Sequence, residues 1–171
     1  MGPILPGGQR EHRQNERMYC LEAVIAREAV LRRVAGSVDA ARVVPLGQGL
    51  SLLPMTDEFF DAVTVAGAGE LDGFWKAPAG FGDTLAISSR HGPFAYVEAD
   101  YFGGEGMQCA QVWSGGAVTL GPVRTGLGER PPASGSPISQ ALRAIGVLRG
   151  AHFDEFDAVG LGRHRETVGW L

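Results

Sequence analysis

Two acidic residues two positions apart, Glu98 and Asp100, are the residues of this sequence whose type and spacing best suit chemistry. They lie in AYVEADYFGGEGMQCAQVW (95–113), where alternation predicts a strand, so both carboxylates share one face, with about 7 Å between their Cα atoms. Such a pair can act as acid and base, or bind a divalent cation with Glu105 of the next turn as a third ligand. The alternative is a solvated sheet face on which polar residues simply alternate.

The residues around this pair predict a contact surface for a partner. The turn Y-F-G-G-E-G holds three glycines, more than a hairpin needs, which indicates a bulge or the close approach of a ligand or partner. In this hypothesis Glu98 and Asp100 point outward, while Ala95 and Ala99 on the opposite face lie beneath a helix. The predicted partner-binding residues are Tyr96, Glu98, Asp100, Tyr101, Phe102, Gly103, Gly104, Glu105 and Gln108.

A second candidate cluster follows the last long helix and comprises Asp154, Asp157, Arg163 and His164. A histidine flanked by arginines can bind an anion or transfer a proton near neutral pH. The alternative is structural, with the acids paired to the arginines across the GLG turn.

The sequence lacks the motifs of zinc binding by histidines, of a serine nucleophile and of phosphate binding. The histidines show no H-x-x-x-H or H-E-x-x-H spacing, and the chain contains no G-x-S-x-G motif and no phosphate-binding P-loop. We therefore predict no catalytic residues, no metal and no cofactor. Cys20 and Cys109 form no C-x-x-C pair and are expected to be buried free thiols, unless neighbouring strands allow a disulfide.

Charge and hydropathy narrow the class of protein. The formal net charge of −4 argues against a nucleic-acid binder, which usually carries a basic stripe. No apolar run approaches the roughly 20 residues that span a membrane, and the first residues lack the apolar core of a signal peptide. A cytoplasmic protein that binds neither nucleic acid nor membrane is expected.

The pattern of elements predicts an α+β fold with a largely antiparallel sheet, built from a hairpin and a three-strand meander, with helices packed on one face. Residues 1–17 are expected to form a flexible arm and 18–171 a single globular domain, with Met18 as a possible natural start. The expected strands are 18–26, two strands within 41–55, and 94–102, 107–113 and 117–122. The expected helices are 27–35, 57–63, 84–90 and 137–148.

The segments YFGGEGMQCAQVW and FDEFDAVGLGRHRETVGW resemble a family of small bacterial proteins without an assigned activity. The resemblance covers most of 18–171, from MYCLEAVIA through ARVVPLGQGLSLLPMTDE to the tail. Such proteins are similar to the immunity partners of secreted bacterial toxins. The resemblance implies a toxin inhibitor and supplies no catalytic residues.

The expected function is therefore that of a small binding protein, an immunity-type inhibitor that occludes its cognate toxin. Its acidic and aromatic side chains would meet a basic cleft. The alternative is a small enzyme or metal-binding protein that uses the Glu98/Asp100 pair. A third possibility is a structural subunit that dimerises through its sheet face.

Overall fold

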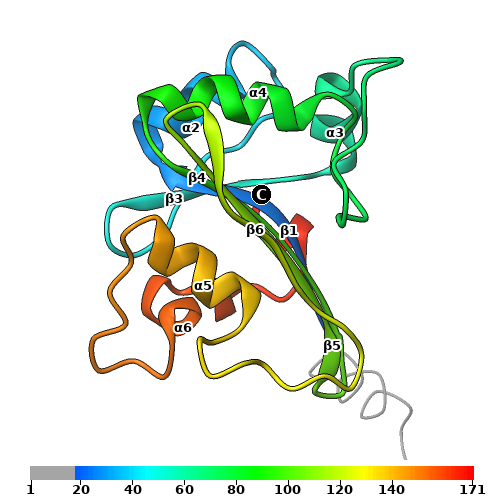
Figure 1. Ribbon diagram of the computed structural model, residues 1–171. Coiled ribbons are helices and arrows are strands. Elements are labelled where there is room, and N and C mark those ends of the chain that lie inside the picture. Colours follow the sequence, from blue (N-terminus) through cyan, green and yellow to red (C-terminus); the bar gives the residue numbers. More distant parts are fainter. Residues whose placement is uncertain (1–17) are drawn as a thin grey trace, which may run out of the picture.

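A computed structural model, which describes residues 18–171, shows one six-stranded antiparallel sheet between two layers of helices (Figure 1). The strand order is β2-β3-β1-β4-β5-β6. The α+β class is confirmed, including the β2–β3 hairpin and the β4–β5–β6 meander. The N-terminal arm expected over 1–17 lies outside the described residues.

The strands are β1 (Met18–Arg27), β2 (Val44–Pro45), β3 (Leu50–Pro54), β4 (Phe94–Phe102), β5 (Glu105–Ser114) and β6 (Ala117–Thr125). The first strand is the segment MYCLEAVIAR, and its position between β3 and β4 explains why residues 21–26 are buried. Pro45 lies in the edge strand β2, where its missing N–H leaves no gap in the hydrogen-bond ladder.

The helices are α2 (Glu28–Ala35), α3 (Asp57–Val63), α4 (Phe81–Ser88), α5 (Pro137–Ala144) and α6 (Glu155–Val159), with 3-10 turns η1 (Ser89–His91), η2 (Leu161–Arg163) and η3 (Thr167–Trp170). Two predicted starts are confirmed by their caps. The Thr56 hydroxyl accepts a hydrogen bond from the Phe59 amide, and the Ser136 hydroxyl accepts one from the Ser139 amide, each helping to satisfy a helix N-terminus.

Helices cover both faces of the sheet, not the one face that the sequence predicted (Figure 1). Ala95, Val97 and Ala99 pack beneath α5, as expected, because these small side chains allow a close approach. The opposite face carries Phe94 and Tyr96, which pack against α2 and α4. That second face was expected to be open to solvent or to a partner, because polar residues alternate along the strand.

Candidate functional site

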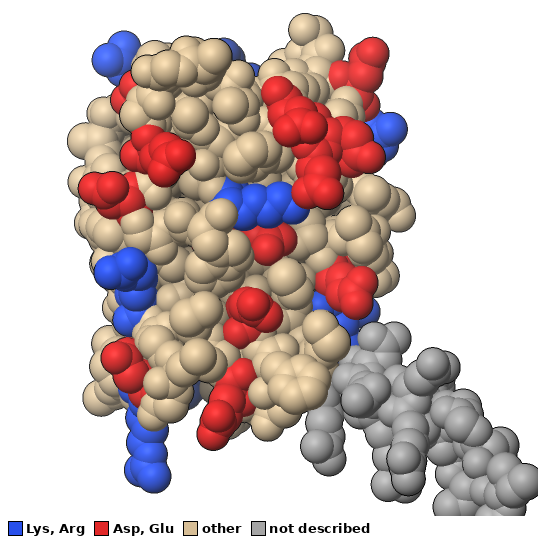
Figure 2. All heavy atoms as spheres, turned by 90° about the vertical axis from the view of Figure 1, so that its right-hand side faces the viewer, with Lys and Arg blue, Asp and Glu red and all other residues tan. Residues whose placement is uncertain are grey.

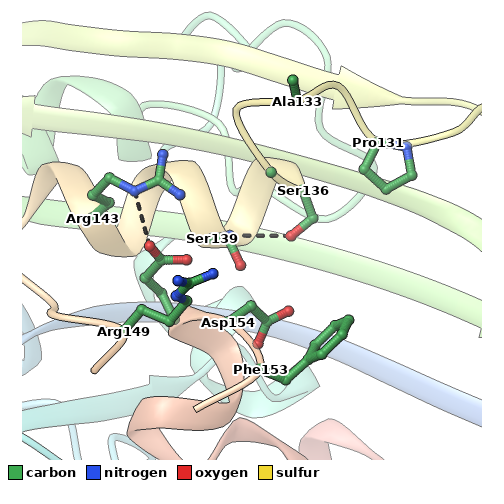
Figure 3. A pocket seen from close by; sticks show the side chains of 10 residues that line it. Pro131, Ala133, Ser136, Ser139, Arg143, Arg149, Phe153 and Asp154 are labelled. Atoms are coloured by element: carbon green, nitrogen blue, oxygen red, sulfur yellow. Dashed lines mark hydrogen bonds and ion pairs between the residues drawn. The ribbon is translucent and has the colours of Figure 1, made fainter. Parts of the chain in front are cut away.

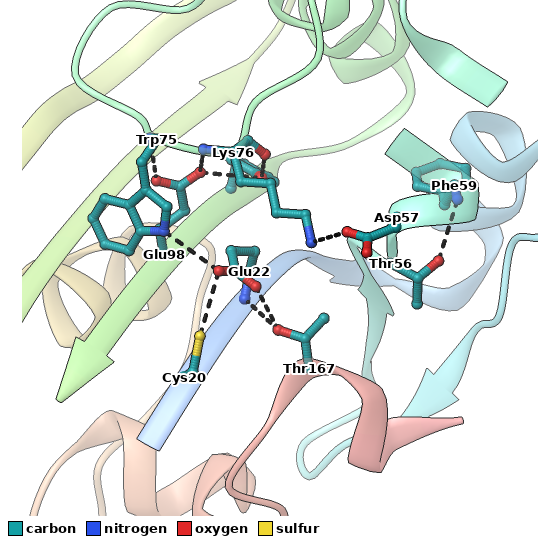
Figure 4. A network of polar contacts seen from close by, with 10 residues as sticks. Cys20, Glu22, Thr56, Asp57, Phe59, Trp75, Lys76, Glu98 and Thr167 are labelled. Atoms are coloured by element: carbon teal, nitrogen blue, oxygen red, sulfur yellow. Dashed lines mark hydrogen bonds and ion pairs between the residues drawn. The ribbon is translucent and has the colours of Figure 1, made fainter. Parts of the chain in front are cut away.

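Glu98, the centre of the predicted site, is buried with no exposed surface. Its two carboxylate oxygens accept hydrogen bonds from backbone amides of the loop before α4, from Trp75 at 2.8 Å and from Lys76 at 2.7 Å (Figure 4). The Tyr96 hydroxyl lies 3.3 Å from the same carboxylate and also donates to the Lys76 carbonyl. The expectation that Glu98 and Tyr96 face outward is therefore wrong, because this loop covers them.

A second buried carboxylate, Glu22, lies directly across from Glu98 on β1. It accepts hydrogen bonds from the Thr167 hydroxyl at 2.6 Å and from the Trp75 indole at 3.3 Å (Figure 4). Sequence reasoning missed Glu22, although a lone acid in the apolar strand MYCLEAVIAR is a usable signal. Buried charges cost stability unless they are paired or hydrogen-bonded, and both of these carboxylates are hydrogen-bonded.

Burial changes the proton affinities of this cluster. It raises the pKa of Glu98 to about 7, although the amides of Trp75 and Lys76 oppose the shift, and the charge of Glu22 adds to it. Burial likewise raises the pKa of the Cys20 and Cys109 thiols to about 12. Both cysteines are free thiols, and since a thiolate is the reactive form, these raised pKa values favour inert side chains. Strand β4 separates their strands, so a disulfide between neighbouring strands does not apply.

The buried carboxylates serve to fasten the loop before α4 onto the sheet. Trp75 and Lys76 are held by Glu98 and Glu22, and the Lys76 ammonium also pairs with Asp57 of α3 at 2.8 Å. With both oxygens of Glu98 engaged by protein amides, the cluster is built as a structural attachment. Within residues 18–171, no group of three or more His, Cys, Asp and Glu side chains is placed to hold a metal ion.

Asp100, two residues beyond Glu98, is exposed, so the predicted pair occupies two different environments. Cross-strand register places Asp100 between Cys20 of β1 and Met107 of β5, and it places Phe102 between Met18 and Glu105. Because alternate residues share a face, these side chains form two adjacent rows at the open end of the sheet. We call this the strand-end face: Met18, Cys20, Asp100, Phe102, Glu105 and Met107.

The glycine-rich turn next to this face needs no ligand to explain it. Gly103 and Gly104 form the two-residue β4–β5 connection with φ of 64° and 87°, as a type I′ hairpin requires. At Gly106 a Cβ atom would lie 2.6 Å from Cγ of Tyr101, so only glycine fits against the neighbouring strand. All three glycines are thus accounted for by the hairpin itself.

Two predicted residues face the other side of the sheet. Gln108 is buried, and its side-chain oxygen accepts a hydrogen bond from the Ile138 amide in the first turn of α5. Tyr101 is half-buried on the same face. Together with Gly104 they line a cavity of about 600 Å³, which Asp154 of the second cluster also lines. The structure therefore joins parts of both candidate sites that the sequence treated separately.

The second cluster does not form one site. Asp154 caps α6 by accepting a hydrogen bond from the Asp157 amide at 2.8 Å. Asp157 pairs with His152 rather than with an arginine of the GLG turn, with 3.2 Å between Nδ1 and Oδ2. Arg163 donates to the Pro45 carbonyl and lies over the Trp170 ring, against which His164 also packs.

Acidic side chains are spread over the face shown in Figure 2 and gather in its upper part, at the level of α3 and the loop that follows it in Figure 1. The exposed acids of that helix and loop are Asp57, Glu58, Asp61, Glu70 and Asp72. Such a surface favours contact with positively charged groups over contact with negatively charged ones.

No helix in the described part of the chain is long and apolar enough to span a bilayer. The chain matches no family model, and comparisons with curated proteins and with solved structures found no similar protein.

Proposed function

We propose that the protein is a binding protein whose strand-end face docks onto a basic surface of another protein, the cognate toxin of an immunity pair. The observation that carries the proposal is the composition of this face. Three large apolar side chains are exposed there, Met18 by 41%, Phe102 by 61% and Met107 by 36%. Exposed apolar residues gathered in one place mark interaction surfaces, and methionine and aromatic residues are enriched in them.

Rigid support makes this face suitable for docking. Its residues lie on three hydrogen-bonded strands, and a tight turn closes one end. On the same side of the sheet, the row of residues next to Cys20, Asp100 and Met107 consists of Glu22, Glu98 and Cys109, which are all buried. A preformed surface loses little conformational entropy when it binds.

Charge indicates the kind of partner. Asp100 and Glu105 stand among the apolar side chains, and the chain as a whole has a net charge of −4. Complementary charge accelerates association and selects against wrong partners, so a basic cleft such as that of a nuclease toxin is the favoured target. Trp75 adds a fourth apolar group at the border of the strand-end face. It lies on the loop that Glu98 holds, and its side chain is 44% exposed.

The test takes a secreted multidomain protein encoded by a neighbouring reading frame as the candidate toxin and measures binding by calorimetry with the purified proteins. The double variant Asp100→Ala/Phe102→Ala should weaken binding by about 30-fold or more, since central interface residues commonly contribute at this level. The matched control is Asp61→Ala/Val65→Ala. Asp61 is an exposed acid of α3, and Val65, which follows that helix, is an apolar residue that is 52% exposed.

Unchanged affinity of the Asp100→Ala/Phe102→Ala protein would reject this surface. Equal losses in the control protein would move the interface to α3 and its loop. Self-association of the purified chain that the same double variant abolishes would assign the face to a second copy, contrary to the proposal.

A further inference from the structure

A separate cavity lies on the opposite side of the sheet, between α5, α6 and the connection that precedes α5 (Figure 3). Its volume is about 540 Å³, within the range of small-molecule sites. Arg143, Arg149, Ser139 and Phe153 line it, and so do the acids Asp154 and Glu155. None of these residues belongs to the strand-end face.

Ser139 is the feature that points to a ligand. Its side chain is 1% exposed, yet its hydroxyl oxygen makes no hydrogen bond with any described residue. Figure 3 shows this hydroxyl extending from α5 towards the segment that carries Arg149 and Asp154. A buried hydroxyl without a partner is unfavourable, and each such group in a folded protein calls for an explanation, such as a bound molecule.

The charges around the cavity leave one cation available. Arg143 pairs with Glu155 at 2.9 Å and also donates to the Ser134 carbonyl. Although burial alone would raise the pKa of Glu155, the hydrogen bond and charge of Arg143, with the charge of Arg149, hold it below its ordinary value. Asp154 caps α6. The Arg149 guanidinium makes no hydrogen bond within residues 18–171, and its five N–H donors suit a planar carboxylate.

A second cavity, lined by aromatic rings and also by Gln108, Asp154 and Arg165, adjoins this charged end. The cavity of about 600 Å³ beyond it shares the lining residues Pro131, Ser136 and Asp154 with the first. Tyr19 and Phe156, whose rings pack edge to face at 5.4 Å, line that second cavity together with Tyr101. A ligand that reaches both cavities needs a polar end and an apolar body.

We propose that this double cavity binds a small organic acid, whose carboxylate is held by the Arg149 guanidinium and the Ser139 hydroxyl and whose apolar body lies among the aromatic rings. This site is independent of the proposed docking of a partner protein. The ligand would satisfy the Ser139 hydroxyl, which the protein alone leaves without a partner.

The probe is phenylacetate, titrated into the ¹⁵N-labelled full chain and followed by NMR, with the neutral phenylacetamide as the matched ligand. A fragment of this size should bind with a dissociation constant on the order of 1–10 mM. Ser139→Ala and Arg149→Gln should each weaken binding by about tenfold, as expected for one hydrogen bond to a charged group. Ser139→Ala removes an unpartnered group and Arg149 is exposed, so both variants should fold.

Arg90→Gln is the matched control, because Arg90 is an exposed arginine of η1, a turn that follows α4 on the other side of the sheet. It should bind phenylacetate as the unchanged protein does. Saturable shifts of the Ser139 and Arg149 signals that phenylacetamide fails to produce would support the proposal. No saturable shift up to about 50 mM phenylacetate, well above the affinity expected of such a fragment, would overturn it. Equal binding of the amide, or unchanged binding by both variants, would overturn it as well.

Discussion

Replacing Glu98 by glutamine should remove a pH dependence of folding that the buried carboxylate creates. Glu98 is wholly buried, and burial raises its pKa from the ordinary value of 4.5 to about 7. The folded chain therefore binds a proton at this residue between pH 4.5 and 7, where the unfolded chain has released it. Stability from this group is complete below pH 4.5 and is lost as the pH rises through 7.

The size of the effect follows from the pKa change. A pKa raised by this amount corresponds to roughly 3 kcal/mol of unfolding free energy lost between pH 4.5 and 8. Glutamine cannot ionise, so the variant lacks this loss. In the native protein, one Glu98 oxygen accepts from the Trp75 amide and the other from the Lys76 amide. Glutamine has only one side-chain oxygen, so the variant loses one of these hydrogen bonds, which should cost about 1–3 kcal/mol of unfolding free energy at low pH. The free-energy gap, taken as the unfolding free energy of the unchanged protein minus that of the variant, should therefore fall by about 3 kcal/mol as the pH rises, from about 1–3 kcal/mol at low pH to zero or below near pH 8.

Urea unfolding followed by circular dichroism at pH 5, 6, 7 and 8 measures this gap directly. Taking the difference between the two proteins cancels the contributions of other titrating groups. Asp57 and Glu155 have lowered pKa values, from the bond to Lys76 and from the neighbouring arginines respectively, so their contributions are lost only in more acidic solution. Asp100→Asn is the matched control, because it changes an exposed acid on the same strand and face.

A gap that stays constant from pH 5 to 8 would refute the reasoning. So would a variant Asp100→Asn that loses the pH dependence as fully as Glu98→Gln does.

Four other substitutions test the local structure. Gly106→Ala should lower the unfolding free energy by about 2 kcal/mol or more, because its Cβ would overlap Tyr101. Gly103→Asn should be tolerated, because Gly103 has open space around it and a positive φ that asparagine can adopt; thermal unfolding measures both effects. Trp75→Phe should speed amide hydrogen exchange in the loop before α4 by removing the indole bond to Glu22, and unchanged exchange would contradict this attachment. Gln108→Ala should cost about 1 kcal/mol in urea unfolding by leaving the Ile138 amide without its acceptor, and an unchanged midpoint would count against it.

Much of the local structure followed from short-range rules. The starts of the helices at residues 57 and 137 and the meander were predicted, because each depends on residues close together in the chain. The face of Ala95 and Ala99 was also predicted correctly, since alternation alone places it. The candidate site was predicted only in part. Its exposed part, Asp100, Phe102 and Glu105, lies in the open as expected, but Glu98 does not.

Alternation determined which side chains share a face of β4, and that is a property of the strand alone. It could not determine what covers that face. The loop holding Trp75 and Lys76 lies more than twenty residues before Glu98, and Thr167, which donates to the neighbouring Glu22, comes from η3 at the far end of the chain. Burial, and with it the raised pKa of Glu98, arises only when these distant segments pack against the sheet. A carboxylate in water and one sealed beneath two backbone amides have the same sequence pattern, and solvent exclusion by the tertiary structure is what makes them different.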